Sequence, residues 1–280
     1  LSTVTTSDNI TFTATLTPTA SVEDATNVIT LDNTAYTDIS GNAGTGTTDS
    51  NNYAVDIVRP TATITVADTS LIIGETSGVT IVFSEAVSGF ANADLTIASG
   101  TLSTVTTSDN ITFTATLTPS ASVEDATNVI TLANTGVSDI AGNAGTGTTD
   151  SNNYAVDTLN PTLNVNIVAA SLNDGANSST VTFEFSEAVT GFDASDVSVP
   201  GGVLSGFSGS GASYSATFTA NDDLETTGSV TVAADSYTDA ADNNGGAGSD
   251  DVAIDTLNPT LTVNIVAASL NDGANSSTVT

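Results

Sequence analysis

Apolar and polar residues alternate in short runs along the whole chain. The segment ITFTATL at residues 10–16 recurs unchanged at residues 111–117, with apolar side chains and threonines at alternate positions. A period of two with one apolar face is typical of a half-buried antiparallel strand. The outward threonines fit a strand by their β-propensity. These runs predict an all-β protein.

Turn residues separate the runs at regular intervals. In residues 56–156 the pattern predicts seven strands, at residues 62–66, 78–83, 94–98, 102–106, 111–117, 129–132 and 153–156. Residues 157–254 show the same succession, and Phe83 and Phe185 fall at the same inward position of the second strand. Seven short strands in about 100 residues indicate an antiparallel β-sandwich. An up-and-down barrel is the alternative architecture.

A recurring seam divides the chain into repeats. Each seam places an aspartate after one strand and a proline before the next, with Asp56, Asp157 and Asp255 at the three junctions. Proline cannot donate to a ladder, so it suits the start of an edge strand. We therefore expect complete domains at residues 56–156 and 157–254. Residues 1–55 then form the C-terminal half of a repeat, and residues 255–280 the N-terminal fragment of another.

Such tandem domains form a linear array in which each repeat contacts its neighbours in the same chain. Similar adjacent domains tend to misassemble with one another, and abundant like charge opposes this. Lateral self-association between chains, as in a filament, is left open by the sequence. Both ends of the sequence fall within a repeat, so we expect it to be a window on a longer array.

The charge balance excludes several function classes. The chain carries 32 acidic residues and one basic residue, Arg59, for a net charge of −31, and it has no Cys, His, Met or Trp. Nucleic-acid binding requires a basic surface, and anionic membranes repel an acidic one. No apolar run approaches the ~18–20 residues of a membrane span. Without His, Cys or Lys, general bases and nucleophiles are limited to carboxylates and hydroxyls, so we expect no enzyme.

Several local motifs together resemble a known family. They are VTIVFSEAV at residues 79–87, the pairs Gly89-Phe90 and Asp94-Leu95, SDIAGN at residues 138–143, and the seam itself. The chain resembles the bacterial immunoglobulin-like tandem repeats of giant secreted adhesins and biofilm-associated surface proteins. The resemblance covers the whole chain, although Asp242 replaces the glycine seen at Gly142.

This resemblance implies tandem Ig-like antiparallel β-sandwich domains in a linear array. It also implies an extracellular extender at the cell surface, commonly calcium-bound, that projects an adhesive module. The alternative function is a glycan- or protein-binding module that uses loops at one pole of a domain. Sugar stacking needs Trp or Tyr at loop tips, and the low aromatic content favours the extender.

Three other motifs have simpler explanations. Residues 245–253 match the calcium β-roll nonapeptide, but a β-roll needs stacked copies and this one occurs once, where we expect a flexible loop. Residues 239–245 resemble an EF-hand without its closing glutamate. The threonine rows could form an ice-binding face, but this requires a long flat array, whereas Ig-like strands are short and twisted.

Acidic residues at the seams are the candidate metal ligands. In a seven-strand sandwich, loops at the exit pole of one domain face loops at the entry pole of the next. At the first seam, this arrangement of loops is expected to bring together Asp56, Glu85, Asp139 and Asn143, facing Glu23 and Asp24. At the middle seam it collects Asp157, Glu187, Asp239, Asp242 and Asn243, facing Glu124 and Asp125. At the third it places Asp255 opposite Asp222, Asp223 and Glu225.

Carboxylates that converge without Lys or Arg repel one another, and a divalent cation converts this repulsion into coordination. Hard oxygen ligands suit Ca²⁺. We therefore expect Ca²⁺ to stiffen the joints between domains. The alternative is an acidic surface that serves only solubility.

Overall fold

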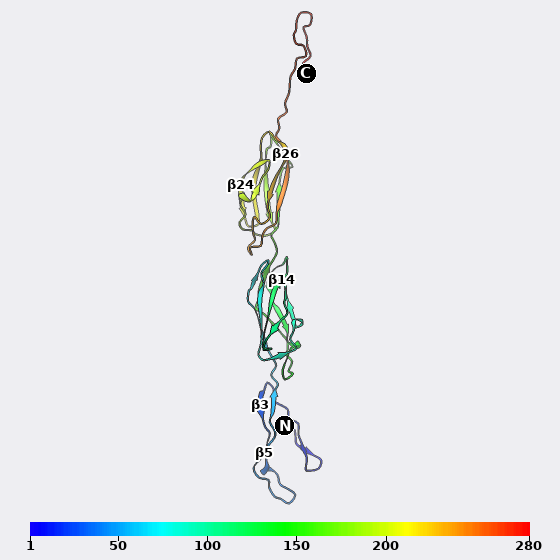
Figure 1. Ribbon diagram of the computed structural model, residues 1–280, viewed down its shortest axis with the longest axis vertical. Helices are drawn as coiled ribbons and strands as arrows, with labels where there is room; N and C mark the ends of the chain where they lie inside the picture. The colour runs from blue at the N-terminus through cyan, green and yellow to red at the C-terminus, as the bar shows by residue number, and fades with distance from the viewer. The chain divides into compact units, whose positions relative to one another are not determined.

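The computed structural model describes residues 1–280, and its regular secondary structure is almost entirely β-strand (Figure 1). Its regular helical structure is limited to four single-turn 3-10 helices, η1 (Asn33–Ala35), η2 (Asn92–Asp94), η3 (Asn134–Gly136) and η4 (Ala194–Asp196). The chain divides into two compact units, Leu1–Thr158 and Leu159–Thr280. Each unit contains one complete repeat.

The first complete repeat is a sandwich of mainly antiparallel strands. These are β7 (Ala62–Val66), β8 (Ser70–Leu71), β9 (Ser77–Phe83), β10 (Val87–Ser88), β11 (Leu95–Ile97), β12 (Gly100–Leu102), β13 (Thr106–Thr107), β14 (Thr112–Pro119), β15 (Glu124–Asn128), β16 (Ile130–Ala133), β17 (Ser138–Asp139), β18 (Thr148–Asp150) and β19 (Tyr154–Asp157). One layer has the order β12-β14-β9-β7, with β13 also on β14. The other contains β11-β16-β18 and β15-β19-β8, where β8 and β19 run parallel.

The second complete repeat has two four-stranded sheets. Its strands are β20 (Leu163–Ile167), β21 (Ser171–Asn173), β22 (Ser178–Phe185), β23 (Val197–Ser198), β24 (Gly202–Ser210), β25 (Ser213–Ala220), β26 (Glu225–Val232) and β27 (Gly248–Asp255). The sheet orders are β20-β22-β25-β24 and β21-β27-β26-β23.

The flanking segments hold less regular structure. Before the first complete repeat lie β1 (Thr5–Thr6), β2 (Phe12–Thr13), β3 (Glu23–Asn27), β4 (Thr30–Asp32), β5 (Thr47–Asp49) and β6 (Tyr53–Asp56). The predicted long strand at residues 10–17 shrinks to β2, and Phe12 is 59% exposed although its equivalent Phe113 is 6% exposed. The reason is that no strands equivalent to β7 and β9 are present among these residues to cover it.

Alternation along the strands sets the two cores. In β9 the side chains of Val79, Ile81 and Phe83 are buried while the residues between them are exposed. Phe83 packs edge-on against Phe90 and Phe113, with ring centroids 5.2 and 5.7 Å apart. The predicted inward and outward faces of these strands are confirmed.

The second core uses more aromatic rings. Phe185 packs edge-on against Phe192, Tyr214 and Tyr237, at centroid distances of 5.0, 5.8 and 4.7 Å. Offset and edge-on contacts of this kind favour a defined packing arrangement. The rings of this repeat therefore lie in its interior.

Several predicted loops are strands in the structure. Residues 124–128, expected in a loop, form β15 beside β19, and the expected loop at residues 142–150 contains β18. The single predicted strand at residues 102–106 is instead split between β12 and β13. Most of residues 245–253, expected as a flexible loop, belongs to β27, which pairs with β26.

Close packing explains the glycine that opens this last segment. A Cβ atom at Gly245 would lie 2.0 Å from the ring of Tyr237, whereas at Gly246 the nearest atom would be 3.7 Å away. Tyr237 is 2% exposed, and its hydroxyl donates to the carbonyl of Gly246 at 2.7 Å. The Tyr237 ring is thus closely packed and cannot move away from a methyl group at position 245.

Truncating a core ring should cost far more stability than truncating an outward threonine. We expect Phe83→Ala to lower the free energy of unfolding by ~3–5 kcal/mol, because it leaves a cavity. Thr114→Ala on the exposed face of β14 should stay within ~0.5 kcal/mol of the parent. Urea titration of both variants measures the difference, and equal losses would contradict the assigned strand faces.

Adjacent glycines provide a second matched pair. Gly245→Ala should destabilise the second repeat by about 1–3 kcal/mol, because the new methyl group collides with Tyr237. Gly246→Ala should change stability by less than ~1 kcal/mol, since the site is open. Thermal unfolding of the two variants compares them, and a harmless Gly245→Ala would show that the ring packs differently.

Candidate metal centre at the seams

Each seam aspartate lies directly opposite a glutamate. The backbone register pairs Glu23 with Asp56 in β3–β6, Glu124 with Asp157 in β15–β19, and Glu225 with Asp255 in β26–β27. Opposed residues of an antiparallel pair have Cβ atoms about 4.5–5.5 Å apart, and like charges there are destabilising. The same unfavourable pair thus recurs at all three seams.

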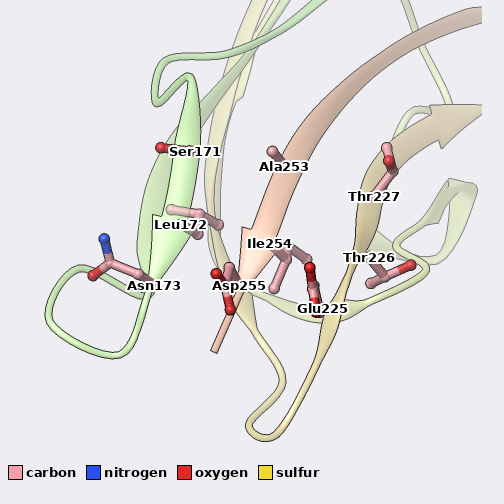
Figure 2. A pocket seen from close by; sticks show the side chains of 9 residues that line it. All are labelled: Ser171, Leu172, Asn173, Glu225, Thr226, Thr227, Ala253, Ile254 and Asp255. Carbon is pink, nitrogen blue, oxygen red and sulfur yellow. The ribbon is translucent and has the colours of Figure 1, made fainter. Parts of the chain in front are cut away.

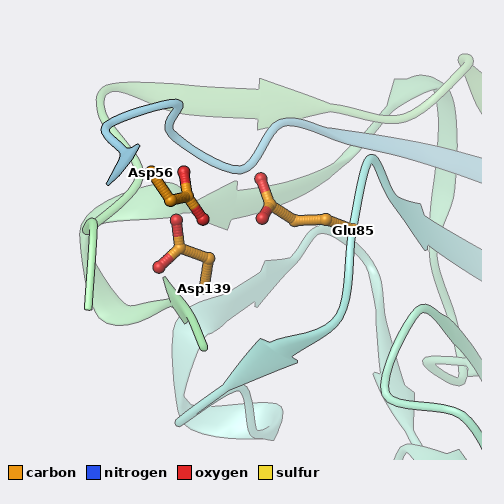
Figure 3. A group of neighbouring side chains, drawn as sticks. All are labelled: Asp56, Glu85 and Asp139. Atoms are coloured by element: carbon orange, nitrogen blue, oxygen red, sulfur yellow. The ribbon is translucent and has the colours of Figure 1, made fainter. Parts of the chain in front are cut away.

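Two more carboxylates join the pair at the first seam. Asp56 ends β6, Glu85 follows β9, and Asp139 ends β17, and their side chains point toward one another (Figure 3). One oxygen from each of the three carboxylates lies within 4.8 Å of the others. Three of the residues that the sequence placed at this seam are therefore brought together by strands far apart in the chain.

Asp139 is the buried member of this group, at 2% exposure. Burial alone would raise the pKa of its carboxyl. Hydrogen bonds outweigh this: the side-chain amide of Asn143 donates at 2.7 Å and its backbone N–H at 2.8 Å, and the pKa falls below its ordinary value. Asp139 is thus held as a fixed anion.

Glu85 shows the opposite shift. Burial is the largest cause that raises its pKa above the ordinary 4.5, followed by repulsion from Asp139, Asp56 and Glu23. The charged form of Glu85 is therefore disfavoured by its surroundings. The effect of Glu23 also shows that the glutamate opposite Asp56 contributes to the same electrostatic environment.

Asn143 orients this group through its amide nitrogen. Besides Asp139, the amide donates to the backbone carbonyl of Asp56 at 3.1 Å. The guanidinium of Arg59 donates to the backbone carbonyl of Ala144, the next residue. The single basic side chain of the protein thus binds the loop that carries Asn143.

The second complete repeat has the same arrangement of residue types. Asp157, Glu187 and Asp239 correspond in sequence to Asp56, Glu85 and Asp139. One oxygen of Glu187 lies within 4.8 Å of one oxygen of Asp239. Asp239 is 1% exposed and accepts from the backbone and side chain of Asn243, both at 2.9 Å.

Asp242 is not one of the clustered carboxylates. It is exposed and has a positive φ of 63°, where the first repeat has Gly142 at 94°. Aspartate tolerates this left-handed conformation better than most side chains. Its position is explained by the turn that it forms, and the structure does not place it among the clustered carboxylates.

Asp125 is also directed elsewhere. Its carboxylate accepts from the backbone N–H of Thr127 at 3.0 Å, and Asp24 does the same with Thr26. Successive residues of a strand point to opposite faces, so Asp125 and Asp24 point away from the neighbouring glutamates. At the first two seams, the residues opposite the seam aspartates are therefore Glu23 and Glu124.

Asp255 and Glu225 border an open depression at the end of the second complete repeat (Figure 2). The lining residues are Ser171, Leu172, Asn173, Glu225, Thr226, Thr227, Ala253, Ile254 and Asp255. Asp255 pairs with Asn173 on one side and with Glu225 on the other. Both carboxylates are exposed, and Asp222 and Asp223 are exposed in the preceding turn. The third seam thus presents its acidic pair on an open surface.

The donor set at the first seam fits a hard divalent cation. Carboxylate oxygens converge from the ends of β6 and β17 and from Glu85 after β9. A fixed anion lies at the bottom of the group, and water has access to the partly exposed Asp56 and Glu85. Ca²⁺ accepts 6–8 oxygen ligands in flexible geometry, including carboxylates and water. The group contains no nitrogen or sulfur donor, so it is less suited to zinc, which commonly binds His nitrogen and Cys sulfur.

Comparison with solved structures finds similarity to, among others, two bacterial adhesins and an invasin. The Yersinia pseudotuberculosis adhesin InvE is 18% identical, with 70% of this chain and 59% of that chain covered and a TM-score of 0.28. Invasin, a bacterial integrin-binding protein, is 14% identical, with 76% and 44% covered and a TM-score of 0.34. The Escherichia coli adhesin FdeC is 15% identical, with 75% and 68% covered and a TM-score of 0.27.

The chain thus spans less than two thirds of the InvE and invasin structures. No curated protein matches the sequence. No helix in the structure has the length and apolar character needed to cross a membrane.

The family assignment comes from the sequence itself. Three consecutive segments, residues 1–55, 56–156 and 157–254, match the family described as bacterial Ig-like domain. The matched segments cover most of the 280 residues, and both complete repeats have the antiparallel sandwich that this description implies. The chain therefore belongs to the bacterial Ig-like domain family.

Proposed function

We propose that this chain is a structural extender of an extracellular bacterial adhesin or surface filament, in which Ca²⁺ stiffens the joints between successive repeats. The observation that carries the proposal is the recurrence of a Glu–Asp pair at every seam, supplemented at the first seam by Glu85 and Asp139. A metal that binds at these positions acts where one repeat ends and the next begins.

The electrostatics of the first seam support a cation more than a solubilising surface. A carboxylate that serves only solubility gains nothing from being brought close to others, and repulsion raises the pKa of Glu85. Asp139 is nevertheless buried and fixed by Asn143 in the charged form. An array of preoriented carboxylates that repel one another binds a divalent ion strongly when the ion removes the repulsion.

A glycan-binding role is less well supported. Sugar recognition commonly uses exposed aromatic faces. In the complete repeats, Phe90 and Phe113 pack with Phe83, and the aromatic rings of the second repeat pack against one another. The aromatic side chains of these repeats are thus used in their cores, which favours a mechanical role.

Glu85→Gln should have opposite effects with and without calcium. Without calcium at pH 7, removal of a repelled charge should raise stability by roughly 0.2–1 kcal/mol, the scale of a partly exposed charge interaction. With calcium, the loss of a ligand should reduce the stabilisation that the metal provides. Calorimetry of parent and variant in EGTA and in CaCl₂ measures both effects.

The pH dependence of stability provides a control for the sign of the Glu85→Gln effect in EGTA. Because the pKa of Glu85 is raised in the folded state, protonation of Glu85 contributes to the stability of the fold. This contribution is fully present below the ordinary pKa of 4.5 and is lost as the pH rises through the folded-state pKa. The gain from Glu85→Gln in EGTA should therefore be small near that pH and grow toward pH 7. Glu75→Gln, outside the cluster, should show neither trend, and equal behaviour of the two variants would refute the site.

Calcium should also change the dimensions of the molecule in solution. We expect small-angle scattering to give a larger maximum dimension in CaCl₂ than in EGTA, because stiffened joints hold the repeats extended. Asp157→Asn should weaken this response, since it removes a ligand at the seam between the two complete repeats. Asp68→Asn, between β7 and β8 and outside the clustered carboxylates, is the matched control. An unchanged dimension in the parent protein would leave the carboxylates as a solubilising surface.

A further inference from the structure

The two complete repeats differ at one edge of the sandwich. In the second repeat, β24 is a nine-residue strand at the edge of the sheet β20-β22-β25-β24 (Figure 1). Its counterpart in the first repeat is broken into β12, of three residues, and β13, of two. An edge strand exposes unpaired backbone N–H and C=O groups that can accept another strand.

In the first repeat a side chain occupies the backbone groups at this break. The amide of Asn92 donates to the carbonyl of Ser103 at 2.8 Å, and its oxygen accepts from the N–H of Val105 at 2.9 Å. The corresponding residue of the second repeat is Ala194, whose methyl group can make neither bond. The edge is thus protected in one repeat and left open in the other.

The open edge is also a neutral surface on an acidic protein. Residues 197–221 contain no charged residue, although the whole chain has a net charge of −31. Among the four strands of this sheet, Glu184 is the only acidic residue, and it accepts a hydrogen bond from the hydroxyl of Ser213. Val203 on β24 is 55% exposed. Backbone groups and apolar surface are therefore accessible here without nearby carboxylates on the same strand.

We propose that β24 is a lateral docking strand through which two copies of this chain pair edge to edge. A basic partner would be attracted to the carboxylates elsewhere and would gain nothing from this neutral strip. A second copy is as acidic as the first, so it can approach closely only where charge is absent. Antiparallel pairing of β24 with β24 of the second copy is compatible with a two-fold axis, so the same segment forms the contact in both molecules.

The shape of β24 limits this pairing to a closed dimer. Its register against β25 shifts between Ser205 and Ser208, and Gly206 has a positive φ of 63°. Such a bulge bends the strand and interrupts its ladder, so the regular portion available to a partner is the segment Gly202–Ser205. Once two copies have paired there, neither has a free β24 edge for a third.

Cysteine cross-linking tests the proposed contact directly. The chain has no cysteine, so Val203→Cys and Ser205→Cys each introduce a single thiol. Opposed strand residues have Cβ distances compatible with a disulfide. Under mild oxidation in EGTA, we expect one of these variants to give about tenfold or more disulfide-linked dimer than the matched variants Thr101→Cys and Ser103→Cys on the protected edge. Equal cross-linking at the two edges would overturn the proposal.

Sedimentation of the intact chain provides a second, independent measurement. Dimerisation should persist in EGTA, which separates it from calcium binding at the seams, and should strengthen with NaCl as repulsion between the acidic molecules is screened. Val203→Glu should weaken it about tenfold or more, because like charges would face each other across the axis. Thr101→Glu should leave it unchanged. A chain that is monomeric at millimolar concentration, or a dimer unaffected by Val203→Glu, would overturn the proposal.

Discussion

A glutamate faces an aspartate across the backbone ladder at each seam, and this opposition places like charge where one repeat gives way to the next. At the first seam the pair is Glu23 and Asp56, and Glu85 increases the negative charge beside it. The one basic side chain, Arg59, binds a backbone carbonyl. Neutralisation must therefore come from protons or from cations in solution. Because the pair lies where one repeat gives way to the next, the proposed cation would couple ionic conditions to the mechanics of the joint.

Carboxylates away from the seams are stabilised within the protein by neutral donors. Asp109 accepts from the backbone N–H groups of Thr112 and Ile111, and Asp193 from the hydroxyl and N–H of Ser195, and both pKa values are lowered. These residues organise turns while contributing to solubility. Glu85 differs because its largest influences, burial and three neighbouring anions, all raise its pKa. The seam cluster is thus distinguished from the general acidity of the chain by local electrostatics rather than by composition.

The sequence predicted the features that depend on period and topology. Strand faces followed from alternation, as Phe83 and Thr114 show. A sandwich also brings the ends of β9 and β17 to the pole at which the chain enters after Asp56. It did not predict β15, because EDATN has no apolar alternation and its pairing with β19 includes a register shift between Asp125 and Asn128. That shift determines that Glu124, and not Asp125, is opposite the seam aspartate, and no local pattern specifies it.

In the two repeats, the residues at the joints between repeats are different from the residues on the edge strands. A seam residue must fit the repeat that follows, so the Asp, Glu and Asn types at a joint are constrained together, as the equivalence of Asn143 and Asn243 illustrates. The edge strand β24 carries none of the clustered carboxylates, so its residues can change without altering that cluster. Exchange of Asn92 for Ala194 alters the hydrogen bonding of an edge while the buried carboxylates at the poles keep their partners. A tandem array could therefore acquire the proposed lateral contacts one repeat at a time, at positions independent of those proposed to set its stiffness.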